Sequence, residues 1–141
     1  MLSPQTRRRI VAGSAVLYLM FIVLVAGWPT PVDRPIGGDL DRLLAFPHDP
    51  VGVPVLVDYS FVEFTMNIVL FAPAGLLVAL LVPARRWWLV AALGGLFSLL
   101  IELAQANLLP ERTASALDVL ANSLGACLGA ALATIRPRSP R

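Results

Sequence analysis

Four apolar segments, each about as long as a bilayer is thick, limit what this chain can fold into more than any other feature. They are residues 10–27, 61–82, 88–109 and 116–135. A helix rises about 1.5 Å per residue, so about 20 residues cross a hydrocarbon core of about 30 Å. Hydrophobic residues make up 57% of the chain and charged residues 14%, whereas a soluble domain carries roughly 25% charged residues. We therefore predict an all-α membrane protein with four transmembrane helices.

The first apolar segment could instead be a signal peptide, because Val25-Ala26-Gly27 resembles a cleavage site. Its apolar run is longer than the usual signal core of roughly 7–15 residues, which favours a retained first span. Either alternative leaves the rest of the topology unchanged.

Residues 28–60, between the first two spans, are polar and rich in proline. The prolines exclude a long helix or a central strand, so we predict a loop that could act as a lid. A short surface helix from Asp39 to Pro47 fits within it, and His48 is expected to be a solvated loop residue. The six prolines are Pro29, Pro31, Pro35, Pro47, Pro50 and Pro54.

Charge predicts the orientation in the membrane. The N-terminal tail 1–9, the 83–88 turn and the C-terminal tail 136–141 fall on one side, which carries no acid. By the positive-inside rule this side is cytoplasmic, so both termini lie inside and the 28–60 loop outside, around a membrane domain of residues 10–135. The Arg residues of that side are Arg7, Arg8, Arg9, Arg85, Arg86, Arg136, Arg138 and Arg141.

Composition excludes several classes of function. The chain has one cysteine, Cys127, so it forms no internal disulfide, and it has neither a Cys/His metal pattern nor a Gly-rich phosphate loop. The Arg residues sit beside membrane spans, so the net charge of +2 does not indicate nucleic-acid binding. We expect no cofactor, no metal and no nucleic acid, and we expect the lipid bilayer as the main surroundings.

Three of the spans carry polar residues near their outer ends. At helical spacing these residues lie about 3–10 Å below the ends of the spans, and each set occupies one helix face. The inner halves are almost wholly apolar, which argues against a monomeric transporter or channel. We therefore predict a ligand-binding polar pocket in the outer leaflet. Its candidate residues are Glu63, Asn67, Glu102, Gln105, Arg112, Asp118 and Asn122.

The polar residues allow three functions. They could hold an envelope component or an amphipathic antibiotic. They could instead simply bond one another and fix the helices, in a structural or partner-binding membrane protein. Glu102 and Asp118 could also share acid–base work in an intramembrane enzyme acting on a lipid-linked envelope substrate, or hold Mg²⁺ for it. No His or Cys reaches this depth and Ser115 has no visible base, so the sequence leans against an enzyme.

Small residues recur every four positions in the last span, at Ala121, Gly125, Gly129 and Ala133. Such a stripe lets a second helix approach closely. Gly94, Gly95 and Ser98 of the third span are one expected counterpart, and the Gly125/Gly129 face could also join two copies as a homo-oligomer. In the second span, Pro73 cannot donate to Val69, which predicts a kink.

Three blocks of residues resemble the VanZ-like family of bacterial membrane proteins. They are Asn67-Ile-Val-Leu-Phe-Ala-Pro73-Ala-Gly75, then Ser98-Leu-Leu-Ile-Glu102-Leu-Ala-Gln105, then Arg112-Thr113 through Asp118 and Asn122 to Gly125 and Gly129. The resemblance covers roughly residues 60–135. It implies a small protein of the bacterial inner membrane with about four spans. The family is named for a protein associated with resistance to teicoplanin, a glycopeptide, so the resemblance adds a glycopeptide to the expected ligands.

Overall fold

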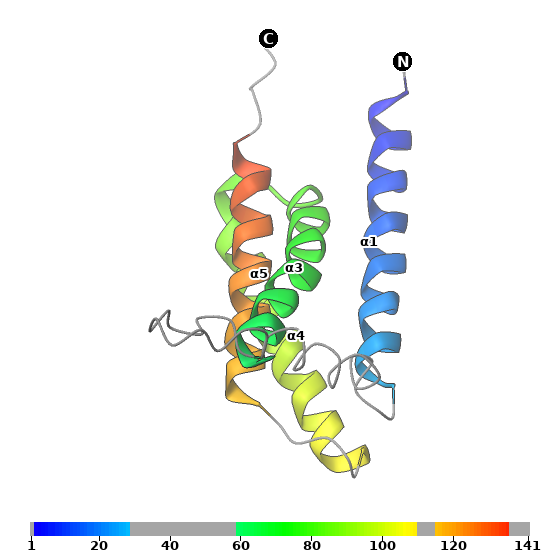
Figure 1. Cartoon of the computed structure of the whole chain (residues 1–141). Helices are drawn as coiled ribbons and strands as arrows, with labels where there is room; N and C mark the ends of the chain where they lie inside the picture. Colours follow the sequence, from blue (N-terminus) through cyan, green and yellow to red (C-terminus); the bar gives the residue numbers. More distant parts are fainter. Residues whose placement is uncertain (1, 29–58, 110–114, 136–141) are drawn as a thin grey trace, which may run out of the picture.

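The computed structural model of this chain describes residues 2–28, 59–109 and 115–135. Within these ranges the chain is mostly helical, and four of the helices are long and apolar enough to cross a membrane, which confirms the predicted all-α architecture with four such helices (Figure 1). Most of loop 28–60, Arg112 and tail 136–141 lie outside the described residues. The elements are α1 (Pro4–Ala26), α3 (Tyr59–Ala79), the short 3-10 helix η1 (Ala84–Arg86), α4 (Trp87–Leu108) and α5 (Ala116–Thr134).

Helix α1 begins six residues before the predicted span, at Pro4 rather than Ile10. The Oγ atom of Ser3 accepts a hydrogen bond from the backbone N–H of Thr6 at 3.1 Å, and Pro4 occupies the first helical position, where a missing N–H does no harm. The three Arg residues at positions 7–9 therefore lie on the helix and not in an extended tail. The other helices begin and end close to the predicted bounds.

Helices α3 and α5 form the closest contact of the fold, and glycine makes it feasible. A Cβ atom on Gly125 would collide with the backbone carbonyl of Ile68, and one on Gly129 with the backbone of Ala72. In the other direction, a Cβ on Gly75 would collide with the backbone of Ala126. The face predicted to join two copies is therefore the one that α3 covers within the chain. The homo-oligomer itself stays a prediction.

Helix α4 packs on a neighbouring strip of α5, where small residues again meet. A Cβ added to Gly94 would collide with the side chain of Ala126, and one on Gly95 would lie 2.9 Å from the Oγ atom of Ser123. The prediction that Gly94 and Gly95 face the Gly125/Gly129 stripe of α5 is therefore wrong, although both do pack against α5. They meet Ser123 and Ala126, however, because α3 already occupies the Gly125 strip.

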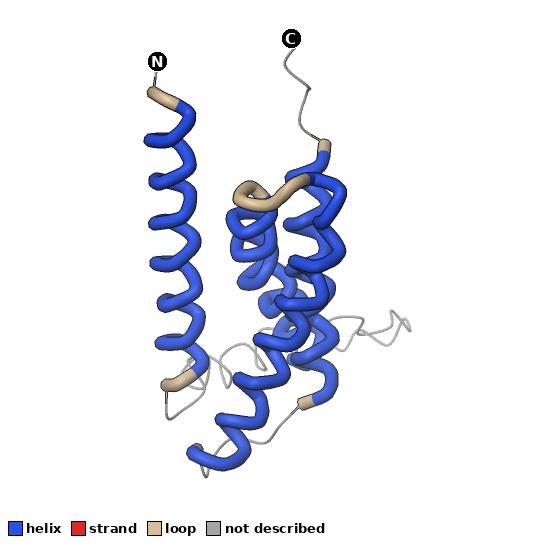
Figure 2. The backbone as a smooth tube through the Cα atoms, turned by 180° about the vertical axis from the view of Figure 1, so that it is seen from behind, coloured by secondary structure: helices blue, strands red, loops and turns tan. Residues whose placement is uncertain are grey.

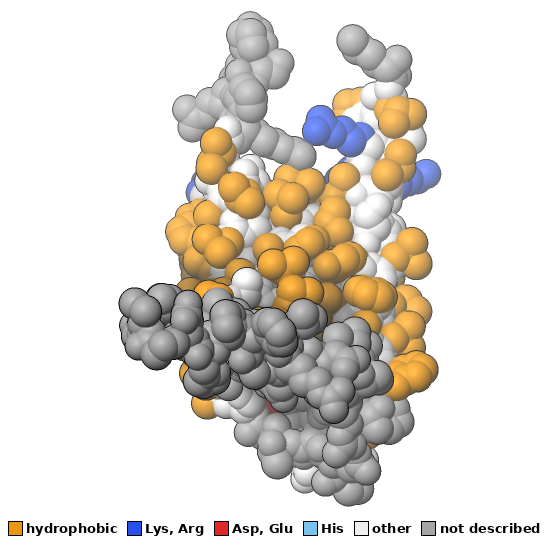
Figure 3. Space-filling model, viewed as in Figure 1, with side chains coloured by type: hydrophobic (Ala, Val, Ile, Leu, Met, Phe, Trp, Pro, Cys, Tyr) orange, Lys and Arg blue, Asp and Glu red, His pale blue; other side chains and the backbone are white. Residues whose placement is uncertain are grey.

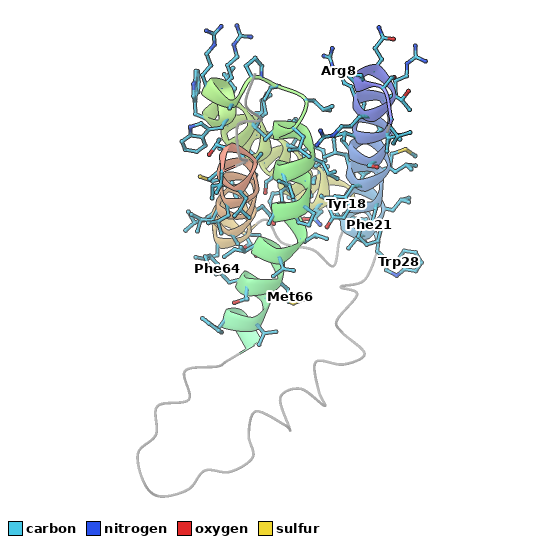
Figure 4. All side chains as sticks on the ribbon, turned by 90° about the horizontal axis from the view of Figure 1, so that it is seen from above. Arg8, Tyr18, Phe21, Trp28, Phe64 and Met66 are labelled. Carbon is cyan, nitrogen blue, oxygen red and sulfur yellow. The ribbon has the colours of Figure 1, made fainter. Side chains whose placement is uncertain are left out.

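Helix α1 stands beside this three-helix group, as the front and rear views show (Figures 1 and 2). Ile22, which is fully buried, packs with Phe71 and Ala74 of α3. The hydroxyl of Tyr18 donates to the backbone carbonyl of Leu70 at 3.0 Å, and Figure 4 shows Tyr18 between α1 and α3. This bond lies within one turn of Pro73, where α3 lacks a backbone donor. In a membrane, side chains of neighbouring helices commonly satisfy the backbone near such a proline.

The charged side chains of the described residues separate to opposite ends of the bundle. Arg7–Arg9 at the start of α1 and Arg85–Arg86 in η1 lie at the end where the chain begins, and Figure 3 shows basic side chains there above a largely apolar surface. The acids lie at the opposite end of the bundle. Glu63 and Asp118 are near the starts of α3 and α5, and Glu102 is near the end of α4. Which end faces the cytoplasm stays a prediction from the positive-inside rule.

We predict that a thiol at the acidic end of the bundle is reached from outside the cell. Trp28→Cys in a Cys127→Ala background should react with a membrane-impermeant maleimide on intact spheroplasts, because both ends of the 28–60 loop are predicted to lie outside. Leu2→Cys, which is also exposed in the fold, should react only after permeabilisation. The reverse pattern would contradict the predicted orientation.

We also predict that Gly129→Ala destabilises the protein, whereas the same change at Gly13 does not. A methyl group at position 129 collides with the backbone of α3, which cannot yield as a side chain can, while a Cβ at Gly13 meets nothing within 4 Å. Overpacking of this kind typically costs about 1–3 kcal/mol. Thermal unfolding of the purified protein in a mild detergent measures the difference, and equal melting temperatures would disprove the packing role of Gly129.

Candidate functional site

The amino end of α5 is held by a carboxylate from another helix. Ser115 is the N-cap residue, and its Oγ atom accepts from the backbone N–H of Asp118 at 3.2 Å. In a capping box, the residue at the Asp118 position would reach back to the N–H of the cap residue. Here that N–H, on Ser115, donates instead to Oε2 of Glu102 on α4 at 2.8 Å. Glu102 therefore completes the cap of α5 across the contact between the two helices.

Asp118 is oriented by helix α3. The Nδ2 atom of Asn67 donates to Oδ1 of Asp118 at 3.0 Å. The carboxylate of Asp118 lies in the first turn of α5 and that of Glu102, on α4, contacts the cap of the same turn, where the helix dipole and the unpaired N–H groups favour negative charge. Such a placement contributes typically about 0.3–1 kcal/mol per charge at a surface and up to about 2 kcal/mol when partly buried.

One turn deeper, α4 and α5 are joined by a second polar pair. The Nδ2 atom of Asn122 donates to Oγ of Ser98 at 2.9 Å, and both side chains are buried, with 5% and 0% of their surface exposed. Asn122 follows Asp118 by four residues and Ser98 precedes Glu102 by four, so the two pairs stack along the same helix contact. Among the described residues, Oδ1 of Asn122 is buried with no hydrogen-bond partner.

Gln105 connects this region to α1. Its Nε2 atom donates to the backbone carbonyl of Ala26, the last residue of α1, at 2.9 Å. The last carbonyls of a helix have no partner within it, so this bond satisfies one of them. Only 8% of the Gln105 surface is exposed. Helix α1 is therefore tied to the bundle through the same set of polar residues.

The structure brings five of the seven predicted site residues into this region, which we call the outer polar layer. Of the other two, Glu63 is exposed on α3, one turn before Asn67, and Arg112 lies outside the described residues. The outer polar layer consists of Asn67, Ser98, Glu102, Gln105, Ser115, Asp118 and Asn122.

Two members of the layer, Ser115 and Ser98, were not among the predicted site residues. The spacing of Ser115 and Asp118 matches the pattern of a helix cap, which was the available signal. Ser98 stands on the same helix face as Glu102, a fact visible in the sequence, but its pairing with Asn122 depends on how α4 and α5 cross. The backbone carbonyl of Ala26 had no signal, because every residue carries one.

Metal ligands do not gather in the described part of the chain. No three His, Cys, Asp or Glu side chains there come together in a way that could hold a metal ion. Glu102 and Asp118 accept hydrogen bonds from a backbone N–H and an amide, respectively. The carboxylates of Glu102 and Asp118 and the buried amide oxygen of Asn122 are hydrogen-bond acceptors in this region.

The sequence model of the VanZ/LLP1 family matches residues 15–136, which is most of the chain. The matched range contains α3, α4, α5 and the whole outer polar layer. No curated protein and no solved structure matches. With four helices able to cross a membrane, this chain is a VanZ-like multi-pass membrane protein and belongs to the VanZ/LLP1 family.

Proposed function

We propose that this protein sits in the bacterial inner membrane and that its outer polar layer binds an amphipathic molecule near the external leaflet. The ligand is a component of the cell envelope or an amphipathic antibiotic such as a glycopeptide, and the role is an accessory one in resistance or envelope maintenance. The apolar part of such a ligand would remain in lipid while its polar part reaches the layer. Family membership supports the class of protein, and the layer supports the binding role.

The observation that carries this proposal is the convergence of two carboxylates on the first turn of α5. A single acid in the centre of a membrane costs about 2.5–3.5 kcal/mol, and less near the edge. Helices can be joined with neutral groups, as Ser98 and Asn122 show one turn deeper. The chain nevertheless uses Glu102 and Asp118 in the layer above. Charged groups kept at such a depth commonly serve a function beyond packing.

One observation favours a second candidate, a structural role. The bonds of Asn67, Glu102, Gln105 and Asn122 each join one element to another, and together they link α1, α3, α4 and the amino end of α5. Interhelical hydrogen bonds of this kind contribute about 0.6–2 kcal/mol each. If these bonds were the only role of the layer, a substitution that removes a charge but keeps its hydrogen bond would change neither the stability of the protein nor its activity.

We therefore predict that Asp118→Asn and Glu102→Gln abolish function without unfolding the protein. Each amide keeps the oxygen that accepts the observed bond, so melting temperature and abundance should stay near those of the parent. Susceptibility to teicoplanin, and binding of teicoplanin by the purified protein, should change at equal protein levels. Asn107→Ala is the control, because Asn107 bonds only a carbonyl of its own helix among the described residues. Unchanged susceptibility and binding in both variants would rule out the proposal.

A further prediction distinguishes the hydrogen bond that Glu102 accepts from the negative charge that it carries, by comparing the stabilities of two variants. Glu102→Leu should lower the melting temperature well below that of Glu102→Gln, because leucine leaves the N–H of Ser115 without its acceptor. A buried donor left unpaired costs about 1–3 kcal/mol. The comparison is made by thermal unfolding in the same detergent. If both variants melt together, Glu102 is not a cap of α5.

A further inference from the structure

We propose that the basic end of the bundle binds the headgroup of an anionic phospholipid on the side of α1 that faces the other helices. Arg8 is the central residue of this lipid site, and Arg85 and Arg86 of η1 add positive charge at the same end. The site lies at the opposite end from the outer polar layer, so it does not depend on the proposed function. It also does not depend on which end of the bundle faces the cytoplasm.

The basic end carries positive charge that no acid nearby balances. Arg7–Arg9 and Arg85–Arg86 are exposed, whereas the acids in the described part of the chain lie at the opposite end. The sequence segments that adjoin the basic end, residues 1–9, 83–88 and 136–141, contain no Asp or Glu. Clusters of Arg beside membrane spans attract anionic lipids. A zwitterionic lipid has no net charge to offer such a cluster.

Two tryptophans indicate the depth of this end in the membrane. Trp87 and Trp88 begin α4 directly after Arg86, and both are exposed. Exposed Trp is typical of the level of lipid headgroups. The guanidinium groups of Arg85 and Arg86 therefore lie close to the level of lipid phosphates, which favours a lipid phosphate over a dissolved anion. Guanidinium N–H groups donate to phosphate oxygens in charge-assisted pairs.

The local helix geometry adds to the demand for negative charge at this end. Helix α1 has no acid in its first turn, and Arg7–Arg9 follow that turn directly. Helix α4 has Arg86 as its N-cap residue, without a side-chain cap bond. The amino end of a helix favours negative and disfavours positive charge. A lipid phosphate near these Arg residues offsets that unfavourable placement.

Helical spacing distinguishes Arg8 from its neighbour Arg9. Residues seven apart lie on nearly the same helix face, so Arg8 shares a face with Ala15 and Ile22, which are only 4% and 0% exposed. Figure 4 shows Arg8 on the side of α1 nearer to the other helices. Arg9 shares a face with Val16, which is 56% exposed. Arg8 therefore faces the other helices, and Arg9 faces away from them.

The other helices do not cover the part of α1 around Arg8. Residues 2–10 are all exposed, and the first buried residue of α1 is Ala15. Helix α1 begins beyond the end of α3 (Figures 1 and 2). A headgroup can therefore reach Arg8 without any helix moving. The buried apolar cluster at this end contains no residue of α1 among the described residues and consists of Ala79, Val90 and Ala130.

The test compares two lipids that have the same acyl chains, because this isolates the headgroup. Dioleoyl-phosphatidylglycerol is anionic, dioleoyl-phosphatidylcholine is zwitterionic, and inorganic phosphate is the dissolved anion. Binding to the full chain in an uncharged detergent is measured by native mass spectrometry. The variants are Arg8→Gln, the pair Arg85→Gln/Arg86→Gln and, as the matched control, Arg9→Gln. The control removes the same charge from the same helix on the face that turns away.

We expect the parent to bind phosphatidylglycerol at least about 10-fold more tightly than phosphatidylcholine, because several Arg residues contribute. Arg8→Gln should weaken the binding of phosphatidylglycerol about 5-fold, as expected for one basic residue near an anionic headgroup. The Arg85→Gln/Arg86→Gln pair should also weaken it. Arg9→Gln should weaken it clearly less than Arg8→Gln does, and inorganic phosphate in large excess should not displace the lipid.

Four results would overturn the lipid site. They are equal binding of the two lipids, displacement of phosphatidylglycerol by inorganic phosphate, unchanged affinity in Arg8→Gln or in the η1 pair, and equal losses in Arg8→Gln and Arg9→Gln. Equal losses would mean that net charge attracts lipid without a site on the inner side of α1. None of these results touches the proposed function, which stands or falls separately with the susceptibility and teicoplanin binding of Asp118→Asn and Glu102→Gln.

Discussion

The capping of α5 by carboxylates is the interaction on which the arrangement of this protein depends. A helix that begins inside a membrane exposes N–H groups that lipid cannot satisfy, and acids placed in lipid lack partners in the same way. In this protein the carboxylates and the N–H groups at the amino end of α5 bond one another. Glu102 accepts the N–H of Ser115, Ser115 accepts the N–H of Asp118, and Asn67 donates to Asp118. The chain therefore keeps two acids at the amino end of α5, where backbone donors and a helix dipole favour negative charge.

Close packing fixes where these groups meet. Helix α5 touches α3 through Gly125 and Gly129, and it touches α4 through Ser123 and Ala126. With backbones so near, even short side chains such as Ser98 and Asn122 can bond across the contact. Without glycine at these positions the helices would stand farther apart, and the pairs above would lose their geometry. The stripe of small residues and the polar layer are thus two parts of one arrangement.

Helix α1 is attached more lightly than the others. Its buried contacts are few, with Ala15 and Ile22 as the buried residues, and its polar links run from Tyr18 to Leu70 and from Gln105 to Ala26. The Gln105 link uses a carbonyl at the end of α1, which has no donor within the helix. The Tyr18 link uses the carbonyl of Leu70, next to Val69, whose own carbonyl loses its helical donor at Pro73. Because Gln105 belongs to the outer polar layer, the position of α1 and the state of that layer are physically connected.

The sequence by itself determined the all-helical fold class and the number of long apolar helices, because apolar length and helical spacing are properties of single segments. It also placed Asp118 and Asn122 on one face, as it did Ser98, Glu102 and Gln105. Only the tertiary structure decided the pairing: that Glu102 meets Ser115, that Asn67 meets Asp118, that Gly125 faces α3, and that Glu63 is exposed. Pairing depends on the rotation and crossing of whole helices. Those are set by where backbones can approach, and no single segment carries that information.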